Sequence, residues 1–222
     1  MDKLKKGDFV EIEYTGKFKL DNKIFDTTSE KIAKENKINN VKIKYGSVIV
    51  CVGEGYVIQG LDKKIENKEC EKEYSFEIEA EDAFGKKNPQ LIKTVSMSLF
   101  KKQKMNPYPG LQLTAGGMIG TVRSVNGGRV LVDFNHPLAG KDLIYEVKIN
   151  KKITDKLKKV RSILTFEARF NEKICELKLN KEILEIILKI KIPKEITEKI
   201  EERIKKLVPE ISKIKFSEEI TT

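Results

Sequence analysis

Tryptophan is absent from this chain of 222 residues, and histidine, cysteine and proline occur only one, three and six times. The three cysteines, Cys51, Cys70 and Cys175, are odd in number, lie far apart and form no Cys-x-x-Cys pair. A disulfide framework is therefore not expected, and the thiols fit a reducing compartment. Since His136 is the sole histidine, a site with several imidazole or thiolate ligands cannot be built, and no metal is expected.

Long apolar runs are also missing. No run approaches the roughly 20 residues that cross a bilayer as a helix. The first residues pass from charge directly into the alternating strand pattern of residues 8–14, without the apolar centre of a signal peptide. The sequence therefore predicts a cytoplasmic protein with no membrane partner.

Charged side chains make up 35% of the chain, and the formal net charge is +10. The basic excess is local: residues 90–138 carry six basic and one acidic side chains, and five lysines lie within residues 151–159. A nucleic-acid partner is not favoured, because no arginine-rich stripe interleaves with aromatics and no zinc-finger or RNA-recognition pattern occurs. The lysine run fits a solvated linker or helix face.

Hydrophobic periodicity separates three regions. In the first, the alternation of residues 8–14 predicts a strand, and Val57, Leu61 and Ile65 have the spacing of a helix. Further strands alternate with turns on both sides of this helix. The pattern predicts an α+β fold.

The other two regions differ in character. The middle region contains an Asn-Gly-Gly turn at residues 126–128 between β-branched runs, which predicts a β-hairpin. The C-terminal region has expected strands at residues 163–170 and 173–179 and an expected helix at 194–207. A last apolar stretch, 211–216, could return to this hairpin. An α/β module is therefore predicted after the middle region.

Five short blocks carry a family resemblance. In order they are Tyr14-Thr15-Gly16, Ile24-Phe25-Asp26-Thr27-Thr28, Gly55-Tyr56-Val57-Ile58-Gln59-Gly60-Leu61, Ala83-Phe84-Gly85 and Leu143-Ile144-Tyr145-Glu146-Val147. Each block alone is weak, but the ordered set resembles the FKBP-type peptidyl-prolyl cis/trans isomerases over residues 5–89 and 139–150. The resemblance implies an FKBP-like fold, in which a small antiparallel sheet wraps a short helix at about 57–65. It also implies a rotamase that accelerates X-Pro isomerisation during protein folding, without a cofactor.

The interruption of these blocks is similar to the insert-in-flap chaperone domain of the SlyD-like subgroup. The layout resembles long-type archaeal members and implies three domains. They are a discontinuous isomerase domain over 1–89 and 139–152, an insert over 90–138, and a C-terminal α/β domain over 153–222.

The resemblance implies a catalytic pocket for proline. Its residues are Tyr14, Phe25, Asp26, Val57, Ile58, Leu61, Phe84 and Tyr145. The Ile58 N–H would hold a substrate carbonyl, and Asp26 would lie near the rotating amide. From the residues alone, Phe25 and Tyr145 could equally fill a core, and Asp26 could be a turn residue. Leu61 replaces a tryptophan of many members and Phe84 a tyrosine, so the pocket is expected to be reshaped.

The insert is expected to bind unfolded or nascent polypeptides that contain X-Pro bonds. The apolar residues assigned to this surface are Leu91, Ile92, Val95, Met97, Leu99, Phe100, Met105 and Tyr108. Methionine adapts its shape to varied partners, which suits promiscuous binding. The alternative is that these residues fill the core of a domain of about 50 residues, which can hardly form without some of them.

The C-terminal region concentrates aliphatic residues between positions 183 and 192. This surface must be buried on the rest of the chain, on substrate or on a second copy, so a homodimer through this domain is predicted. Two other functions stay open at the level of sequence. One is a pure binding protein with a vestigial pocket, and the other is a translation or nucleic-acid accessory factor that uses the lysine run.

Overall fold

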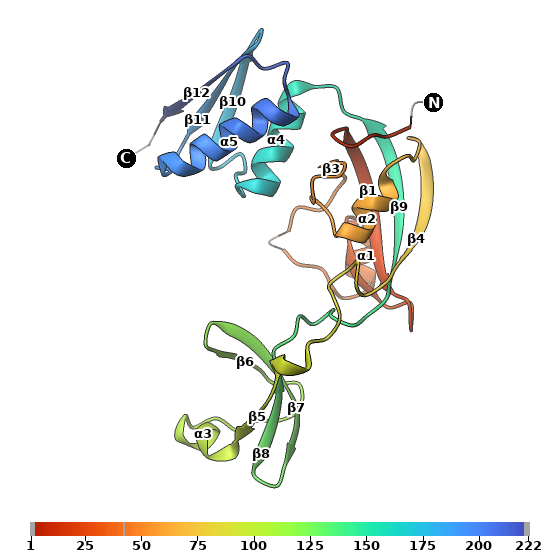
Figure 1. Ribbon diagram of the computed structural model, residues 1–222, viewed down its shortest axis with the longest axis vertical. Helices are drawn as coiled ribbons and strands as arrows, with labels where there is room; N and C mark the ends of the chain where they lie inside the picture. The colour runs from red at the N-terminus through yellow and green to blue at the C-terminus, as the bar shows by residue number, and fades with distance from the viewer. Residues whose placement is uncertain (1–2, 42, 220–222) are drawn as a thin grey trace. The chain divides into compact units, whose positions relative to one another are not determined.

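Figure 1 shows the computed structural model of the chain, which describes residues 3–41 and 43–219. The chain divides into two units, Met1–Ile78 with Ile144–Thr222, and Glu79–Leu143. Both combine antiparallel strand pairing with few helices, so the predicted α+β class is confirmed. The second unit contains the segment predicted as an insert. The predicted division into three domains stays a prediction.

A five-stranded sheet forms the centre of the first unit. Its strand order is β2-β1-β9-β4, and β3 pairs with β1. Buried Ile12, Leu143, Val147 and Ile149 alternate with polar residues along their strands, which is the pattern of a sheet with one covered face. The strands are β1 (Phe9–Phe18), β2 (Ile24–Thr27), β3 (Val48–Cys51), β4 (Lys72–Ile78) and β9 (Leu143–Lys152).

Two short helices accompany this sheet, α1 (Glu30–Glu35) and α2 (Gln59–Ile65). The helix predicted from the spacing of Val57, Leu61 and Ile65 is α2, and it buries Leu61 and Ile65. It contacts β4. The helix therefore contributes apolar side chains to the core of the sheet.

The C-terminal region is an α/β module within the first unit. Its three-stranded sheet has the order β10-β11-β12, with β11 antiparallel to β10 and parallel to β12. The parallel pair needs a crossover, and helix α5 provides it. The elements are α4 (Lys156–Glu167), β10 (Cys175–Asn180), β11 (Ile183–Leu188), α5 (Lys194–Leu207) and β12 (Lys213–Glu218).

The strand expected at residues 163–170 is wrong, because most of that stretch belongs to α4. Asp155 caps the helix: its carboxylate accepts a hydrogen bond from the Lys158 N–H at 2.8 Å. Val160, Ile163 and Leu164 then recur at helical spacing and are fully buried. The cap and this spacing outweigh the β-branched composition that suggested a strand.

Much of the aliphatic surface at residues 183–192 is covered within the chain. Leu184, Ile186, Ile187 and Leu188 are buried, whereas Ile183 and Ile190 are exposed. The predicted homodimer stays a prediction. Among the described residues, no helix is both long and apolar enough to cross a membrane.

The lysine run also has partners inside the chain. Lys151 and Lys152 pair with Glu11 and Asp8 at 3.6 and 2.7 Å, and Lys159 pairs with Glu210 at 3.4 Å. These contacts favour a structural role for the run over a track for phosphates.

The second unit is built on a four-stranded antiparallel sheet of order β5-β8-β7-β6. The predicted Asn-Gly-Gly turn joins β7 to β8, with Gly127 and Gly128 at φ of +54° and +78°. Phe100, Val122, Val130 and Val132 form its buried core. The elements are a 3₁₀ turn η1 (Pro89–Leu91), β5 (Ile92–Ser96), α3 (Met97–Lys102), β6 (Gln112–Ala115), β7 (Met118–Asn126) and β8 (Arg129–Asp133).

The segments that enter and leave this sheet are bonded to each other. The Asn88 N–H donates to Asn135 Oδ1 at 2.7 Å, and Asn135 Nδ2 donates back to the Asn88 carbonyl at 3.0 Å. Beside them, buried Asp133 accepts hydrogen bonds from Arg123 Nη2 at 2.9 Å and Lys87 Nζ at 3.2 Å. These hydrogen bonds hold the segment before β5 against the segment after β8.

Charge pairing at Asp133 makes the stability of this unit depend on pH. Burial alone would raise the pKa of this carboxyl, but hydrogen bonds from Asn135, Arg123 and Lys87 outweigh burial and hold the pKa below its usual range. Since the folded pKa is the lower one, the stabilisation is complete above about pH 5 and is lost progressively as the pH falls below it.

We expect Asp133→Asn to lower the local stability of this unit by about 2 kcal/mol, because hydrogen bonds to a charged acceptor are lost. Native-state amide exchange at Val130 and Val132 measures the effect. The variant should also lack the loss of protection between about pH 5 and pH 3 that the wild type shows. Arg129→Gln, which removes an exposed charge from the same strand, is the control. Equal exchange rates in Asp133→Asn and wild type would contradict the assignment.

Candidate active site

Four aromatic rings meet on the first unit's sheet, on strands β1, β2 and β9. The Tyr145 ring centroid lies 5.7 Å from that of Tyr14 and 5.9 Å from that of Phe25, the latter pair edge to face. The Phe25 ring also lies 5.0 Å from Phe18. Three residues predicted for the pocket are therefore brought together with one that was not predicted.

A glycine gives the Phe25 ring its place. In the β1–β2 register Gly16 is opposite Asp26. A Cβ atom added to Gly16 would lie 2.7 Å from Phe25 Cζ, closer than such atoms approach. The ring thus lies directly on the strand backbone, a position that only glycine permits.

Asp26 lies at the edge of this aromatic cluster. The Tyr14 hydroxyl donates a hydrogen bond to Asp26 Oδ2 at 3.1 Å, which orients the exposed carboxylate. Burial, together with the negative charge of Asp26, raises the pKa of Tyr14 and of Tyr145 above the usual tyrosine value. Both phenols therefore stay protonated at neutral pH and act as hydrogen-bond donors rather than bases.

The other predicted residues come from the loop before α2 and its first turn. Ile58 is the residue before the helix, Val57 and Ile58 are half-buried, and Leu61 is buried. Within the part of the chain that the structure describes, no acceptor is bonded to the Ile58 N–H. This amide is therefore available to a ligand, as the first amides of a helix usually are.

A buried carboxylate fixes that loop. Asp62 Oδ1 accepts from the Gly53 N–H at 2.8 Å, and Oδ2 accepts from the Gly55 N–H at 2.9 Å. Both glycines have positive φ, +78° and +74°, a conformation that other residues rarely adopt. Asp62 is only 7% exposed, so two hydrogen bonds to it are worth more than they would be in water.

Phe84 lies in the second unit. Its ring stacks on His136 with centroids 4.6 Å apart and planes inclined by 3°. Its predicted role in the pocket stays a prediction.

Sequence reasoning did not single out Phe18, Gly16 or Asp62 as site residues. For Phe18 and Gly16 a signal was present, since both share the strand face of Tyr14 at intervals of two residues. For Asp62 the sequence offers no such signal, because only the fold shows that its carboxylate meets two loop amides.

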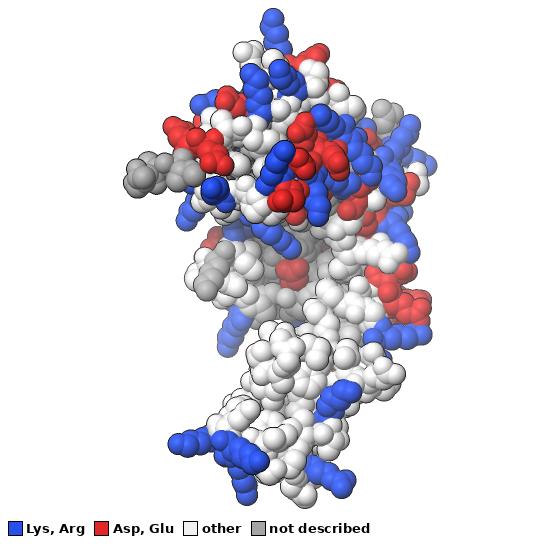
Figure 2. All heavy atoms as spheres, turned by 60° about the vertical axis from the view of Figure 1, so that its left-hand side comes forward, with Lys and Arg blue, Asp and Glu red and all other residues white. Residues whose placement is uncertain are grey.

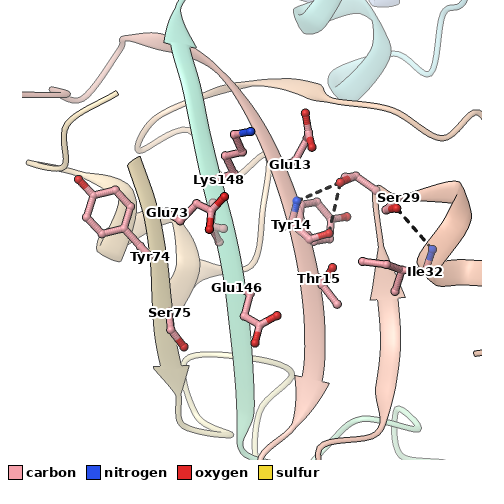
Figure 3. A pocket seen from close by; sticks show the side chains of 12 residues that line it. Glu13, Tyr14, Thr15, Ser29, Ile32, Glu73, Tyr74, Ser75, Glu146 and Lys148 are labelled. Carbon is pink, nitrogen blue, oxygen red and sulfur yellow. Dashed lines mark hydrogen bonds between the residues drawn. The ribbon is translucent and has the colours of Figure 1, made fainter. Parts of the chain in front are cut away.

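A hollow of about 600 Å³ lies over β1, β4 and β9, and Tyr14 of the aromatic cluster is among the residues that line it (Figure 3). Its charged lining residues are Glu13, Glu73, Glu146 and Lys148. Glu13 alternates with Tyr14 on β1, and Glu146 and Lys148 alternate with Tyr145 on β9, so on these two strands the charged residues point to the opposite face of the sheet. The charged, open lining does not suit a proline ring, so the aromatic cluster remains the candidate site.

Comparison with known proteins identifies the family. Residues 1–101 match the family of FKBP-type peptidyl-prolyl cis-trans isomerases, and residues 93–138 match the family described as FKBP26, IF domain. The chain is 32% identical over 146 residues to the short-type peptidyl-prolyl cis-trans isomerase of Methanocaldococcus jannaschii, covering 66% of this chain and 92% of that protein. The chain belongs to the FKBP-type peptidyl-prolyl cis-trans isomerases. It is an isomerase of X-Pro peptide bonds.

Two further relatives of this FKBP-type isomerase are bacterial. It is 33% identical over 108 residues to the SlyD isomerase of Treponema pallidum, covering 47% of this chain and 61% of that protein. It is 32% identical over 103 residues to a probable FKBP-type 16 kDa isomerase of Pseudomonas fluorescens, covering 44% of this chain and 67% of that protein. The predicted resemblance to the FKBP and SlyD-like proteins is thereby confirmed.

The residues predicted to bind unfolded chains divide by exposure in this isomerase. Phe100 is in the core of the second unit, and Val95, Met97 and Met105 pack against it half-buried. Leu91 and Ile92 are also half-buried, whereas Leu99 and Tyr108 are 52% and 59% exposed. Two further exposed apolar residues, Met118 and Ile119, were not predicted.

Substitutions at Tyr145 test the aromatic cluster. We expect Tyr145→Ala to lower kcat/KM for a Leu-Pro or Phe-Pro peptide by about tenfold, because a pocket wall is lost, and Tyr145→Phe to stay within about twofold of wild type. Exchange NMR of the peptide's cis and trans forms gives the rates. Glu146→Gln, on the next residue and the opposite face, is the matched control. An unchanged rate in Tyr145→Ala would exclude the cluster as the site.

Proposed function

We propose that this isomerase catalyses X-Pro rotation at the cluster of Tyr14, Phe25, Asp26 and Tyr145, and that residues 90–138 hold unfolded polypeptide chains. The observation that carries the first part is the arrangement of three aromatic rings beside a carboxylate oriented by Tyr14, on the same unit as an unbonded Ile58 N–H. A further role for Val57 and Leu61 as pocket walls belongs to the same proposal.

The chemistry requires no covalent step. Rotation about the X-Pro amide breaks resonance and has a barrier of about 18–20 kcal/mol. A site lowers this barrier when it fits the twisted amide better than either planar form. Aromatic walls remove water from the amide carbonyl, which is less polarised in the twisted state, while fixed dipoles hold the groups on either side.

Each polar group has a place in this proposal. The Ile58 N–H binds a substrate carbonyl and so fixes one side of the rotating bond. The Asp26 carboxylate, held by the Tyr14 hydroxyl, supplies a fixed charge at the edge of the apolar walls. Because these groups are held before substrate arrives, little reorganisation is needed as the amide twists.

The chaperone part of the proposal is supported by exposed apolar side chains on the second unit. Leu99, Tyr108, Met118 and Ile119 are between 49% and 66% exposed. Its core is small, so few other residues could cover them. Exposed apolar groups on a basic surface suit transient contacts with unfolded chains.

Charge defines which chains this surface favours. Asp133, the one acidic residue of 90–138, is buried and bonded to Arg123 and Lys87. The exposed charges of this segment are therefore basic, as the face drawn in Figure 2 illustrates. Unfolded chains with acidic residues beside apolar ones are thus the expected clients.

Holding a client on the same chain as the proline site raises the local concentration of its X-Pro bonds at that site. Protein substrates should therefore be isomerised better than short peptides. The three free cysteines support the proposal of a cytoplasmic location.

The full-length variant Leu99→Gln/Ile119→Gln tests the holding surface. We expect proline-limited refolding of an unfolded protein to slow by about fivefold, because effective concentration is lost, while the peptide rate stays the same. Leu20→Gln, which removes a 97% exposed leucine from the first unit, is the control. Equal refolding rates in the double variant and the control would contradict the proposal.

Salt dependence tests the client class. Binding of an acidic unfolded chain should weaken by about tenfold between 50 and 500 mM salt, because the Debye length shortens, whereas a basic chain of equal hydrophobicity should bind more weakly at low salt. Fluorescence anisotropy of labelled chains measures both. Preference for the basic chain at low salt would contradict this assignment.

A further inference from the structure

The loop between β3 and α2 is held from two directions. Asp62 of α2 binds the Gly53 and Gly55 amides from within, as described above. The two residues that alternate with these glycines, Glu54 and Tyr56, are bound by the C-terminal helices α4 and α5. Every residue from 53 to 56 is therefore bonded by its backbone or its side chain.

Arg203 of α5 is the centre of the outer contacts. Its Nε donates to Glu167 Oε2 and its Nη2 to Glu167 Oε1, both at 2.7 Å, and Nη2 also reaches Glu54 Oε2 at 3.0 Å. The guanidinium thus joins the last residue of α4 to the loop. Its planar, forked donors fit a carboxylate in a way that a lysine cannot reproduce.

These ion pairs are partly shielded from water. The side chains of Arg203, Glu54 and Glu167 are 27%, 12% and 24% exposed. Burial alone would raise the pKa of Glu167, but hydrogen bonds from Arg203 and Tyr56 lower it below the usual glutamate value. Partly buried pairs of this kind are screened less by salt than pairs on the surface.

Tyr56 makes the second outer contact. Its hydroxyl donates to Glu167 Oε1 at 2.8 Å, and its ring stacks on Phe166 with centroids 4.7 Å apart and planes inclined by 15°. The side chain is 9% exposed. One α4 residue, Glu167, therefore receives hydrogen bonds from both the loop and α5.

Tyr56 directly precedes Val57 and Ile58, which carry the proposed pocket wall and the proposed substrate amide. A shift of Tyr56 would move the Ile58 N–H with it, since only one residue lies between them. Small displacements of a group that binds the reacting bond lower catalysis steeply.

We infer that α4 and α5 form a brace that sets the position of the proline site, with Arg203 and Glu167 as positioning residues. The inference rests on the proposed site. It gives the C-terminal module a role in catalysis in addition to the stability that its packing provides.

Full-length Arg203→Gln tests the brace. We expect kcat/KM for a Leu-Pro peptide to fall by about tenfold, because Glu54 of the loop and Glu167 of α4 lose the guanidinium that joins them, with an intermediate loss in Arg203→Lys. Lys205→Gln is the matched control: it removes an exposed cation of the same helix, which pairs with Glu201 at 2.6 Å. The control should have the wild-type rate.

Loop motion separates positioning from plain stability. At a temperature where every variant is folded, ¹⁵N relaxation dispersion at Val57 and Ile58 should be present in Arg203→Gln and absent in Lys205→Gln. Tyr56→Phe keeps the ring and removes one hydroxyl, so it tests the brace even if Arg203→Gln does not fold. Its kcat/KM is expected to fall by about threefold. In the double variant Arg203→Gln/Tyr56→Phe, the fold-decrease in kcat/KM should be smaller than the product of the two single fold-decreases, because both residues are bonded to Glu167.

Two outcomes would overturn the inference. One is a kcat/KM within about twofold of wild type in both Arg203→Gln and Tyr56→Phe. The other is a lowered melting temperature without any change in rate or in dispersion at Val57 and Ile58. Failure of the proposed site is recognised separately, because Tyr145→Ala would then leave the rate unchanged as well.

Discussion

The register between β1 and β2 places Gly16 opposite Asp26, and the geometry of the candidate site depends on it. With this pairing, the Phe25 ring lies on the bare backbone of Gly16 and meets Tyr145 edge to face. The same pairing brings the Asp26 carboxylate within reach of the Tyr14 hydroxyl. A slip of β2 by one residue would turn Phe25 away from Tyr14, to the face of the sheet where Glu13 and Glu146 stand.

Because side chains alternate along each strand, the same strands give the two faces of this sheet different chemical character. One face carries the half-buried Tyr14 and the buried Tyr145, whose hydroxyls stay protonated, and the other carries acidic and basic side chains at the hollow. Rotation of an amide suits the aromatic face better than the charged face, because water would stabilise the planar, polarised form. The charged face keeps the sheet hydrated and gives no comparable surface to a proline ring.

Short-range patterns predicted those parts of the fold that local chemistry decides. The helix expected at 194–207 is α5, because Pro193 favours a helix start after it and Pro209 prevents the helix from continuing. The hairpin at Gly127 and Gly128 followed from the positive φ that its turn requires. The rings of Tyr14, Phe25 and Tyr145, which the structure brings together, were predicted by the family resemblance of the ordered blocks and not by local patterns.

Contacts between distant segments could not be predicted in this way. Nothing near Glu54 in the sequence indicates that Arg203, 149 residues away, is bonded to it. Such pairings depend on tertiary structure, which composition and spacing do not encode. The error at 163–170 is of another kind, because the Asp155 cap and the helical spacing of Val160, Ile163 and Leu164 were local signals that favoured a helix.

The paired asparagines at the base of the second unit have an evolutionary consequence. Asn88 and Asn135 are 47 residues apart in the sequence yet bonded to each other, and they lie between β4 and β9, which are neighbours in one sheet. A segment whose two ends meet can be lengthened, replaced or deleted while the host strands keep their pairing. The insert is in this sense a cassette, and lineages could exchange the surface that selects clients while they retain the catalytic sheet unaltered.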